Sequence, residues 1–531
     1  MFYAVFVAIT MPGAWWFYLA YSSIEILLCT VIAWLAWRWP RLGYLWGALA
    51  LWLVGCLLGG AYGLPVKAWQ WLPLTLLVPA LWNASHALAL SRPDFPKALY
   101  GFGGMVLADA FGSWMKCFAT LALAATLVYA RPYSAQRQML QRGGELFTLS
   151  LFALLGIYTM IAGNHFLVIY LGLELISLSS FALVALRREH LLANEAAMKY
   201  FILGSLASGF LLYGLSMLYG ATGSMLLPEV LQSVMQHTAK RDILMLGLVF
   251  IVAGLAFKLG AAPFHMWLPD VYQGAPTSIT LILAAAPKLA IFAVMLRLLV
   301  TGLLELAPQW QLMLMVLAVC SLLIGNLSAV MQSNAKRMLA WSTIGQNGFM
   351  LLAFVVSHAN GNNLSLKDAC AASMFYMLSY TIAALVSFGI LMLLSREGYE
   401  CENLSDLSGL NHHRPLYAGI MALSMLSLAG VPLTVGFYAK FKVLHALLTV
   451  PTTLHIALAV LAIVMSVVGA FAYLRIIKIM FFDAPEHTQP AALQAGYGVR
   501  ATLTFNGALL LVFGILPAGL LQLCEQAIIN M

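Results

Sequence analysis

The feature that most constrains this chain is a series of long apolar runs, separated by short segments that hold charged residues, glycine or proline. A helix needs roughly 20 apolar residues to cross a hydrocarbon layer about 30 Å thick. With 531 residues, of which 63% are hydrophobic and 9% charged, the chain has room for about fourteen such helices and for no large domain outside the membrane. We therefore predict an all-α polytopic membrane protein with spans at residues 17–37, 43–63, 104–130, 145–162, 165–186, 195–222, 243–272, 276–300, 309–331, 336–358, 368–394, 415–448, 454–482 and 499–524.

Lys and Arg are unevenly divided between alternate loops. One set of loops holds Arg38, Arg41, Arg131, Arg137, Arg142, Arg187, Arg188, Lys336, Arg337, Arg396, Arg414 and Arg500, whereas the other holds only Lys67, Arg92, Lys97, Lys240, Arg241 and Lys367. Because cytoplasmic loops carry the excess of positive charge, the first set is predicted to be cytoplasmic. Both termini are then periplasmic, in a bacterial inner membrane. The same alternation argues against a further span at 71–90, which contains two prolines, Asn83 and His86 and is predicted to be interfacial or re-entrant.

The composition also excludes several kinds of site. The seven cysteines lie far apart, mostly inside apolar runs, and form neither a C-x-x-C motif nor a Cys/His cluster, so iron–sulfur, zinc and disulfide frameworks are not supported. The net charge of +8 is explained by the loop bias rather than by nucleic-acid binding. Residues 1–15 lack a positively charged start and an evident cleavage site, so they do not indicate a signal peptide.

Two parts of the chain resemble each other. Ala197-Met-Lys-Tyr-Phe-Ile-Leu203 and Tyr213-Gly-Leu-Ser-Met-Leu218 have counterparts, in the same order, in Ala372-Ser-Met-Phe-Tyr-Met-Leu378 and Phe388-Gly-Ile-Leu-Met-Leu393. Each unit holds five predicted spans, and an odd number inverts the second copy relative to the first. The predicted organisation is N-terminal peripheral helices and a loop (1–103), a third transmembrane helix with a cytoplasmic loop (104–144), a first five-helix unit (145–300), an inverted second unit (309–482) and a C-terminal helix (499–531).

Several ionisable residues fall inside the predicted spans, where each needs a partner or a water-filled cavity. Glu174 lies at the middle of its span and favours an ion pathway over a purely structural carboxylate. Lys258 precedes Gly260 and Pro263, which interrupt a span. A helix broken inside a membrane is tolerated only where it is buried in protein or lines a cavity, so Lys258 is predicted to lie beside water and to exchange a proton.

Four further residues are interpreted by the same reasoning. Lys288 lies part of the way down the next span and is interpreted as a relay residue, whereas Arg297 is interpreted as a structural pair or a snorkelling side chain. Lys199, close to the cytoplasmic side, is equally compatible with a gate and with an interfacial lysine. His265, beside Pro263, could pass protons or simply cap the break.

A second broken helix is predicted around Gly430, Pro432 and Gly436, with Lys440 shortly after it. Two broken helices at corresponding positions, each with a lysine nearby, are the best sequence indication of an ion pathway at the membrane midplane. Because the second unit is inverted, Lys440 is expected to match Lys258 only if the segment around Gly436 is unwound and brings Lys440 back beside the break.

At these positions the sequence closely resembles the subunit N family of the proton-pumping NADH:quinone oxidoreductase, respiratory complex I, over residues 104–524. The resemblance is carried by Phe257-Lys-Leu-Gly-Ala-Ala-Pro-Phe-His-Met-Trp-Leu-Pro-Asp-Val-Tyr-Gln-Gly-Ala-Pro276, Leu171-Gly-Leu-Glu-Leu-Ile-Ser177, Lys336-Arg-Met-Leu-Ala-Trp-Ser-Thr-Ile-Gly345 and Leu426-Ser-Leu-Ala-Gly-Val-Pro432. Sister subunits usually have an Asp-Ala-His sequence where this chain has Asp-Val-Tyr.

The resemblance implies fourteen helices with two inverted five-helix units, in which Glu174 pairs with Lys258, Lys288 connects the halves and Lys440 is the terminal exchange residue. It also implies that NADH, FMN, the iron–sulfur clusters and quinone are bound by partner subunits, with none on this chain, and that sister antiporter-like subunits are neighbours in the membrane arm. The chain departs from many relatives at Gln346, where they have a histidine. The alternative function is a subunit of a Na⁺/H⁺ antiporter or of a membrane-bound hydrogenase.

Overall fold

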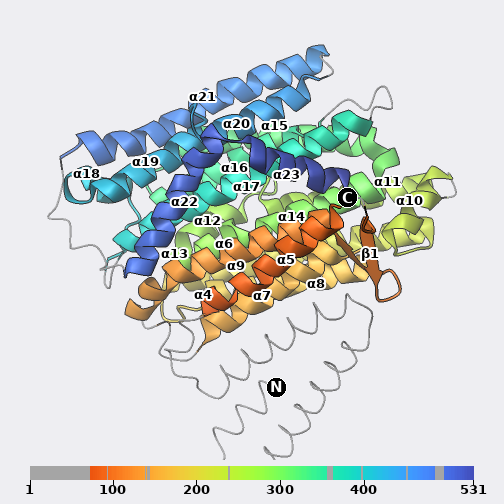
Figure 1. Cartoon of the computed structure of the whole chain (residues 1–531), viewed down its shortest axis with the longest axis horizontal. Coiled ribbons are helices and arrows are strands. Elements are labelled where there is room, and N and C mark those ends of the chain that lie inside the picture. Colours follow the sequence, from red (N-terminus) through yellow and green to blue (C-terminus); the bar gives the residue numbers. More distant parts are fainter. Residues whose placement is uncertain are drawn as a thin grey trace, which may run out of the picture.

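The computed structural model describes residues 72–531 except 93, 138, 140–143, 237–238, 356–362, 396–398, 450–451 and 485–495, and the side chains of 363–365. The predicted spans at 17–37 and 43–63 lie outside the described residues. Most of the described chain is helical, and the long helices run side by side in one bundle (Figure 1). Eleven of them are long and apolar enough to cross a membrane. The predicted all-α polytopic membrane fold is confirmed.

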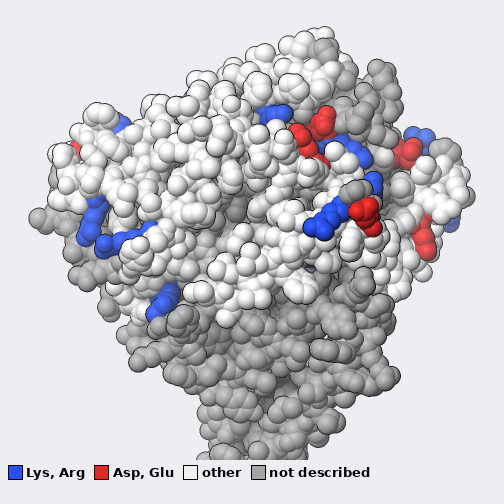
Figure 2. All heavy atoms as spheres, viewed as in Figure 1, with Lys and Arg blue, Asp and Glu red and all other residues white. Residues whose placement is uncertain are grey.

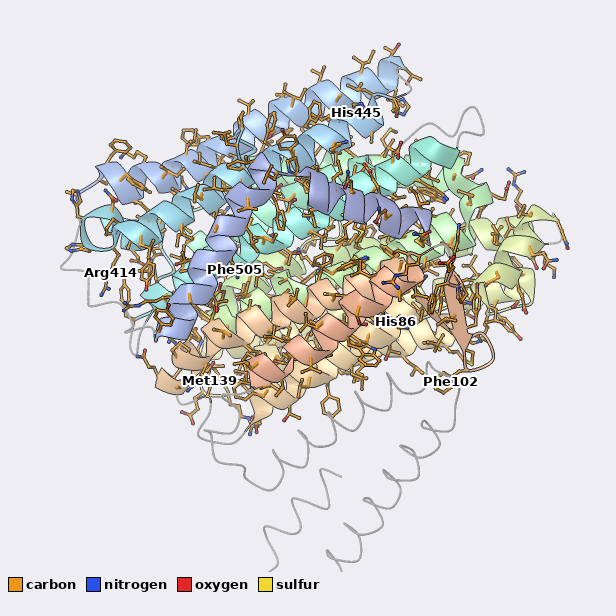
Figure 3. All side chains as sticks on the ribbon, in the orientation of Figure 1. His86, Phe102, Met139, Arg414, His445 and Phe505 are labelled. Atoms are coloured by element: carbon orange, nitrogen blue, oxygen red, sulfur yellow. The ribbon has the colours of Figure 1, made fainter. Side chains whose placement is uncertain are left out.

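The surface of the bundle agrees with this assignment. Figure 2 shows charged side chains gathered toward the two ends of the helices, with a broad uncharged band between them. Figure 3 places Met139 and Arg414 at one end, and Phe102 and His445 at the other. The loop after residue 130 and Arg414 therefore lie at the same end, as the alternation of positive loops predicts.

The N-terminal described part corrects one prediction. The segment predicted to be interfacial or re-entrant is, from residue 72, one helix of spanning length with a turn at Leu76, which divides it into Leu72–Thr75 (α4) and Leu77–Leu90 (α5). It packs along α6. Pro79 lies in the first turn of α5, where its missing N–H group is not needed. Asn83 is buried and donates to the Pro79 carbonyl (2.7 Å) and the Tyr158 hydroxyl (3.0 Å). Its amide is thus compatible with a buried helix.

The next span also begins later than predicted. A short antiparallel hairpin, Ala98–Gly101 (β1) and Val106–Asp109 (β2), precedes the helix Ala110–Gln136 (α6), with Ala98 paired to Asp109. The Asp109 carboxylate accepts from the Gly112 amide (2.9 Å) and so caps α6.

The first unit follows the predicted order and contains one additional amphipathic helix, α10. Its elements are Glu145–Ala162 (α7), Phe166–Val184 (α8), Leu191–Thr222 (α9), Leu227–Met235 (α10), Arg241–Leu259 (α11), Trp267–Gly274 (α12), Thr277–Ala284 (α13), Ala286–Met295 (α14) and the π-helix Leu296–Gly302 (η2).

The second unit and the C-terminal part contain Leu304–Leu306 (η3), Ala307–Val330 (α15), Ala335–Leu352 (α16), Asn363–Leu394 (α17), Leu404–Leu407 (η4), Leu410–His413 (α18), Pro415–Ala429 (α19), Val435–Leu447 (α20), Thr453–Phe482 (α21), Tyr497–Ile515 (α22) and Ala518–Ile529 (α23). The predicted single C-terminal helix is wrong. It is divided at Pro517, which has no N–H group to continue the helix, and α23 turns to pack against α17 and α6 (Figure 1).

Matching close contacts support the predicted repeat. A Cβ atom on Gly172 of α8 would lie 2.6 Å from the Met160 amide of α7, and one on Gly325 of α15 would lie 2.5 Å from the Gly345 amide of α16. The first two helices of each unit therefore approach each other through glycine. Both α11 and α19 end at a left-handed glycine, Gly260 (φ 77°) and Gly430 (φ 85°), a conformation that glycine adopts without steric cost.

The break in the second unit differs from the expectation in its position. The helix is interrupted between Gly430 and Thr434, whereas Gly436 lies in the first turn of α20. A Cβ atom on Gly436 would overlap the carbonyl oxygen of Ser427 in α19. The absence of a side chain at Gly436 thus allows α20 to fold back closely against the end of α19.

We expect Gly436→Ala to weaken the packing of α20 against α19, because the added methyl group has no space beside Ser427. Overpacking of this kind typically costs about 1–3 kcal/mol. The change would be measured as a lower unfolding temperature of the purified protein in detergent, followed by circular dichroism. Gly419→Ala is the matched control, because Gly419 lies in α19 with no neighbouring atom within 4 Å. Equal effects of the two substitutions would contradict this role of Gly436.

Candidate functional site

Three of the predicted site residues are lysines in the interior of the bundle. Lys258, Lys288 and Lys440 expose 9%, 1% and 9% of their surface. They come from α11, α14 and α20, so both units contribute. An ammonium group inside a membrane costs several kcal/mol unless it is paired or hydrated, and the surroundings of each lysine therefore decide what it can do.

Lys258 lies in the last turn of α11, two residues before Gly260. Its Nζ donates to the hydroxyl of Ser177 on α8 (2.8 Å) and to that of Ser208 on α9 (3.0 Å). A cation is also favoured at this end of a helix by the helix dipole. Lys258 is therefore solvated by two hydroxyl groups, each of which can both accept and donate a proton.

Glu174 lies on α8, three residues before Ser177, and is half-buried. The pairing of Glu174 with Lys258 implied by the family is not a direct ion pair among the described residues, since the Lys258 ammonium is bound by the two serines. The Glu174 Oε1 is buried without a hydrogen-bond partner in the described part of the chain. Glu174 lies about one helical turn from Ser177, which binds Lys258.

Lys288 is the third residue of α14, directly after a kink that sequence reasoning missed. The helix is interrupted at Ala285 (φ −106°, ψ −88°), and Pro287 is the sequence signal for that interruption. The Lys288 Nζ has no hydrogen-bond partner among the described residues. It lies 5.3 Å from the ring centre of Tyr380 and 5.9 Å from that of Tyr272. Lys288 also lies between the units, because Tyr380 belongs to α17.

Lys440 lies in the second turn of α20 and reaches back to the break. Its Nζ donates to the carbonyl of Ala429 (2.9 Å), the last residue of α19, and to the Ser466 hydroxyl on α21 (2.7 Å). Lys440 thus lies beside the break, although Gly436, which was expected to be unwound, is in the first turn of α20. Each broken helix thus has one buried lysine next to its interruption, Lys258 before it and Lys440 after it.

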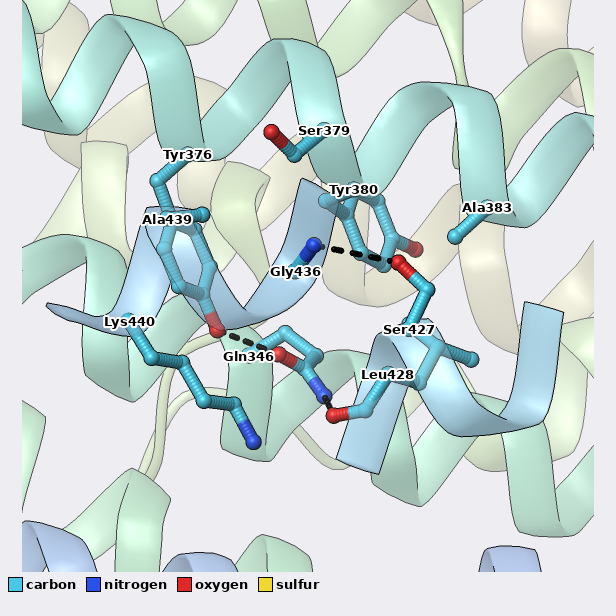
Figure 4. Close-up of a pocket in the computed structure, with 10 residues that line it drawn as sticks. All are labelled: Gln346, Tyr376, Ser379, Tyr380, Ala383, Ser427, Leu428, Gly436, Ala439 and Lys440. Carbon is cyan, nitrogen blue, oxygen red and sulfur yellow. Dashed lines mark hydrogen bonds between the residues drawn. The ribbon is translucent and has the colours of Figure 1, made fainter. Parts of the chain in front are cut away.

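A narrow cavity with room for about one water molecule lies beside Lys440. It is lined by Gln346, Tyr376, Ser379, Tyr380, Ala383, Ser427, Leu428, Gly436, Ala439 and Lys440 (Figure 4). Tyr380 contributes to the cavity wall and also faces Lys288. The two lysines are therefore separated by one tyrosine and a partly polar space.

Gln346 is held firmly in that cavity wall. Its Nε2 donates to the Leu428 carbonyl (3.1 Å) and to the Tyr473 hydroxyl (3.0 Å), and its Oε1 accepts from Tyr376. Figure 4 shows Gln346 between Tyr376 and Leu428. An amide does not titrate in the physiological range, so Gln346 orients its neighbours and does not itself exchange a proton.

The two remaining site candidates are placed differently. Lys199 is exposed and forms ion pairs with Glu195 and Asp270 (both 2.9 Å). Asp270 also binds Arg337 (2.8 Å), so Lys199 belongs to a surface network and is separate from the three buried lysines. His265 is buried, its ring centre lies 5.2 Å from that of Trp341 with the two rings tilted by 57°, and its Nδ1 has no hydrogen-bond partner among the described residues.

Arg297 is confirmed as a structural pair. Its Nη2 binds the Asp109 carboxylate (2.7 Å) and its Nε donates to the Ile161 carbonyl (2.8 Å), with both charged groups buried. This pair ties the end of α14 and η2 to the hairpin and α7.

Sequence reasoning missed the serine and tyrosine partners of the lysines. Ser177, Ser208 and Ser466 bind Lys258 and Lys440. Serine is frequent in apolar helices and has no distinctive spacing there, so no pattern selects these three. Lys336 is a further buried lysine, bound to Glu402 and to the Ala275 carbonyl (both 2.9 Å). Its position at a helix start made it look like an ordinary loop residue.

Comparison with known proteins identifies the family. A family model described as "NADH:quinone oxidoreductase/Mrp antiporter, TM" matches residues 162–466. NADH-quinone oxidoreductase subunit N of Polaromonas naphthalenivorans is 58% identical over 455 residues, which are 86% of this chain and 90% of that protein.

Solved structures agree with this match. A chain of respiratory complex I from Thermus thermophilus with bound aureothin is 33% identical, with a TM-score of 0.72 over 89% of this chain and 97% of that chain. A chain of the Mrp complex from Dietzia sp. DQ12-45-1b is similar in fold, with a TM-score of 0.73 over 91% of this chain and 97% of that chain, but it is only 20% identical. This chain therefore belongs to the NADH-quinone oxidoreductase subunit N family.

Proposed function

We propose that this chain translocates protons across a bacterial inner membrane as subunit N of NADH:quinone oxidoreductase, while electrons pass from NADH to quinone on other subunits. The observation that carries the proposal is the buried row of Lys258, Lys288 and Lys440, in which the outer two lie at helix breaks. FMN, the iron–sulfur clusters and quinone belong to those partner subunits in this proposal.

The contacts of the row suit stepwise proton transfer. A protonated lysine that passes its proton on becomes a neutral amine, which buried surroundings tolerate better than an ammonium group. Ser177 and Ser208 beside Lys258, and Ser466 beside Lys440, can donate and accept in turn. Between Lys288 and Lys440 the proton crosses the cavity beside Tyr380 and Gln346. We infer the order Lys258, Lys288, Lys440.

Glu174 supports a specific arrangement of partners. It shares one face of α8 with Leu167, Leu171 and Leu178, which are 47%, 64% and 57% exposed. Side chains three and four residues apart lie on the same side of a helix. A carboxylate on a lipid-facing side would be costly, so we infer that a sister membrane-arm subunit covers this face and hydrates or pairs Glu174. A periplasmic C-terminus is part of the same proposal, whereas the helix at Leu72–Leu90 is a span that the prediction of two periplasmic termini did not count.

The antiporter alternative shares the fold but has weaker support. The likeness to the Mrp complex is at 20% identity, against 58% for the Polaromonas subunit N. Purification in mild detergent separates the two functions, because a complex I subunit would co-purify with flavin and iron–sulfur chains. A chain that purifies with other antiporter subunits alone would favour the alternative.

We expect Glu174→Gln to lower proton pumping and quinone reduction together by several-fold, because the charge that favours protonated Lys258 is lost. Both rates would be measured in inverted membrane vesicles supplied with NADH. Glu195→Gln is the matched control, since Glu195 is an exposed acid that pairs only with Lys199 among the described residues. Normal turnover and a normal proton gradient in the Glu174 variant would refute the role of this carboxylate.

Lys288→Met should reduce pumping by about a hundredfold, the scale on which a positioned proton-transfer group contributes. Methionine retains length and apolar character but carries no exchangeable proton. Lys288→Arg should also fail, because an arginine retains its proton too strongly to release it. The ratio of protons moved to NADH oxidised in assembled complexes is the measurement. If both variants assemble and pump normally, Lys288 is only structural.

Lys440→Met should likewise block pumping, whereas Lys442→Met should leave it nearly unchanged. The two residues are neighbours on α20, but the described contacts to the break and to Ser466 belong to Lys440. The same vesicle assay, with assembly verified by native gel electrophoresis, compares them directly. A larger loss for Lys442→Met would move the exchange site away from Lys440.

A further inference from the structure

We propose that the rings of Tyr272 and Tyr380 form an aromatic cage that stabilises the protonated form of Lys288. The proposal rests on the relay role of Lys288 given above and identifies the two residues that tune it. The cage is built across the subunit, with Tyr272 on α12 of the first unit and Tyr380 on α17 of the second.

The solvation of Lys288 differs from that of the other two lysines. Lys258 has two hydroxyl acceptors, and Lys440 has a carbonyl and a hydroxyl as well as the Phe349 ring at 5.0 Å. Lys288 is the most buried of the three and has no oxygen acceptor among the described residues. Its ammonium lies within cation–π range of two rings, at 5.3 and 5.9 Å.

The tyrosine hydroxyls are not directed at Lys288. The Tyr380 hydroxyl is hydrogen-bonded to Thr343 Oγ1 (2.8 Å), and the Tyr272 hydroxyl is buried with no partner in the described chain. The stabilising group is therefore the negative face of each ring. A ring face attracts a cation but accepts no proton, so the cage favours a charged Lys288 without competing for the proton that it passes on.

No charged side chain of the described structure takes the place of these rings. The helices packed against α14 are α6, α7, α11, α13 and α17, together with η2. The charged residues along them are engaged elsewhere, Lys258 with serines, Arg297 with Asp109, and Lys116 beside the Tyr158 ring. The remaining charges lie near the helix ends, at Arg131, Glu145, Arg241, Asp242, Lys367 and Asp368. Among the described residues, the titratable side chains whose rings lie in cation–π range of the Lys288 ammonium are Tyr380 (5.3 Å) and, from α12, Tyr272 (5.9 Å).

Tyr380 also lies close to the other lysine of the proposed relay. It lines the cavity that contains Lys440, so one ring is in contact with Lys288 on one side and borders the route to Lys440 on the other. A shift of α17 against α14 would change both contacts at once. The cage thus places the proton affinity of Lys288 under the control of the packing between the two units.

The test replaces the residue at position 380 with phenylalanine and with 4-fluoro-, 3,5-difluoro- and 3,4,5-trifluorophenylalanine in the assembled complex. Fluorine withdraws electron density from the ring face with little change in volume. The proton-to-NADH ratio is measured in vesicles over a series of pH values. Tyr380→Phe is the unfluorinated reference of the series, and each added fluorine should move the alkaline limb to lower pH relative to it, because Lys288 then remains protonated only under more acidic conditions.

Substitutions that remove the rings supply the second measurement. Tyr272→Leu and Tyr380→Leu should each move the alkaline limb by about one pH unit, which corresponds to about 1.4 kcal/mol, whereas Tyr272→Phe is the matched control and should not move it. A graded fluorine series with no shift, or equal shifts for Tyr272→Phe and Tyr272→Leu, would overturn the cage. Loss of pumping in Lys288→Met with unshifted cage variants would reject the cage alone, whereas normal pumping in Lys288→Met would reject the relay on which it rests.

Discussion

The cost of leaving polar groups unpaired inside hydrocarbon is the constraint on which this structure depends. Breaking a helix releases carbonyl groups, and burying a lysine introduces a cation that requires acceptors. At the second break the buried cation and the released carbonyl satisfy each other, since Lys440 donates to the carbonyl of Ala429, the last residue of α19. Gly436 makes this possible by letting α20 return against α19. A proton site and a helix interruption are thus one structural unit.

The sequence predicted the helical membrane fold, the two breaks and the buried lysines, because glycine, proline and charge are conspicuous in apolar runs. It did not predict the single helix at Leu72–Leu90 or the division of the C-terminal helix at Pro517. The same residue type has opposite effects at these places, as Pro79 lies in a first turn and Pro517 ends a helix. The position of each proline within its helix decides which effect it has, and a local sequence pattern does not determine that position.

The site was predictable only in part for a related reason. A lone lysine in a span is visible in the sequence, but its partners lie on other helices, as Ser177 and Ser208 do for Lys258. The family pairing of Glu174 with Lys258 is therefore not a direct ion pair here, because Ser177 and Ser208 bind the ammonium group and Glu174 is only half-buried. In our proposal a neighbouring membrane-arm subunit covers that carboxylate.

The cage around Lys288 also has a consequence for biosynthesis. Its walls are made at different times, because Tyr272 is synthesised before Lys288 and Tyr380 long after it. The helix α14 therefore reaches the membrane while one of its two rings does not yet exist. Until α17 is inserted, the nascent first unit must hold Lys288 as a neutral amine or turn it toward water at the translocation site. In the proposed cage, the charge of Lys288 is fully stabilised only when the second half of the chain has been inserted, so completion of the chain and completion of the cage coincide.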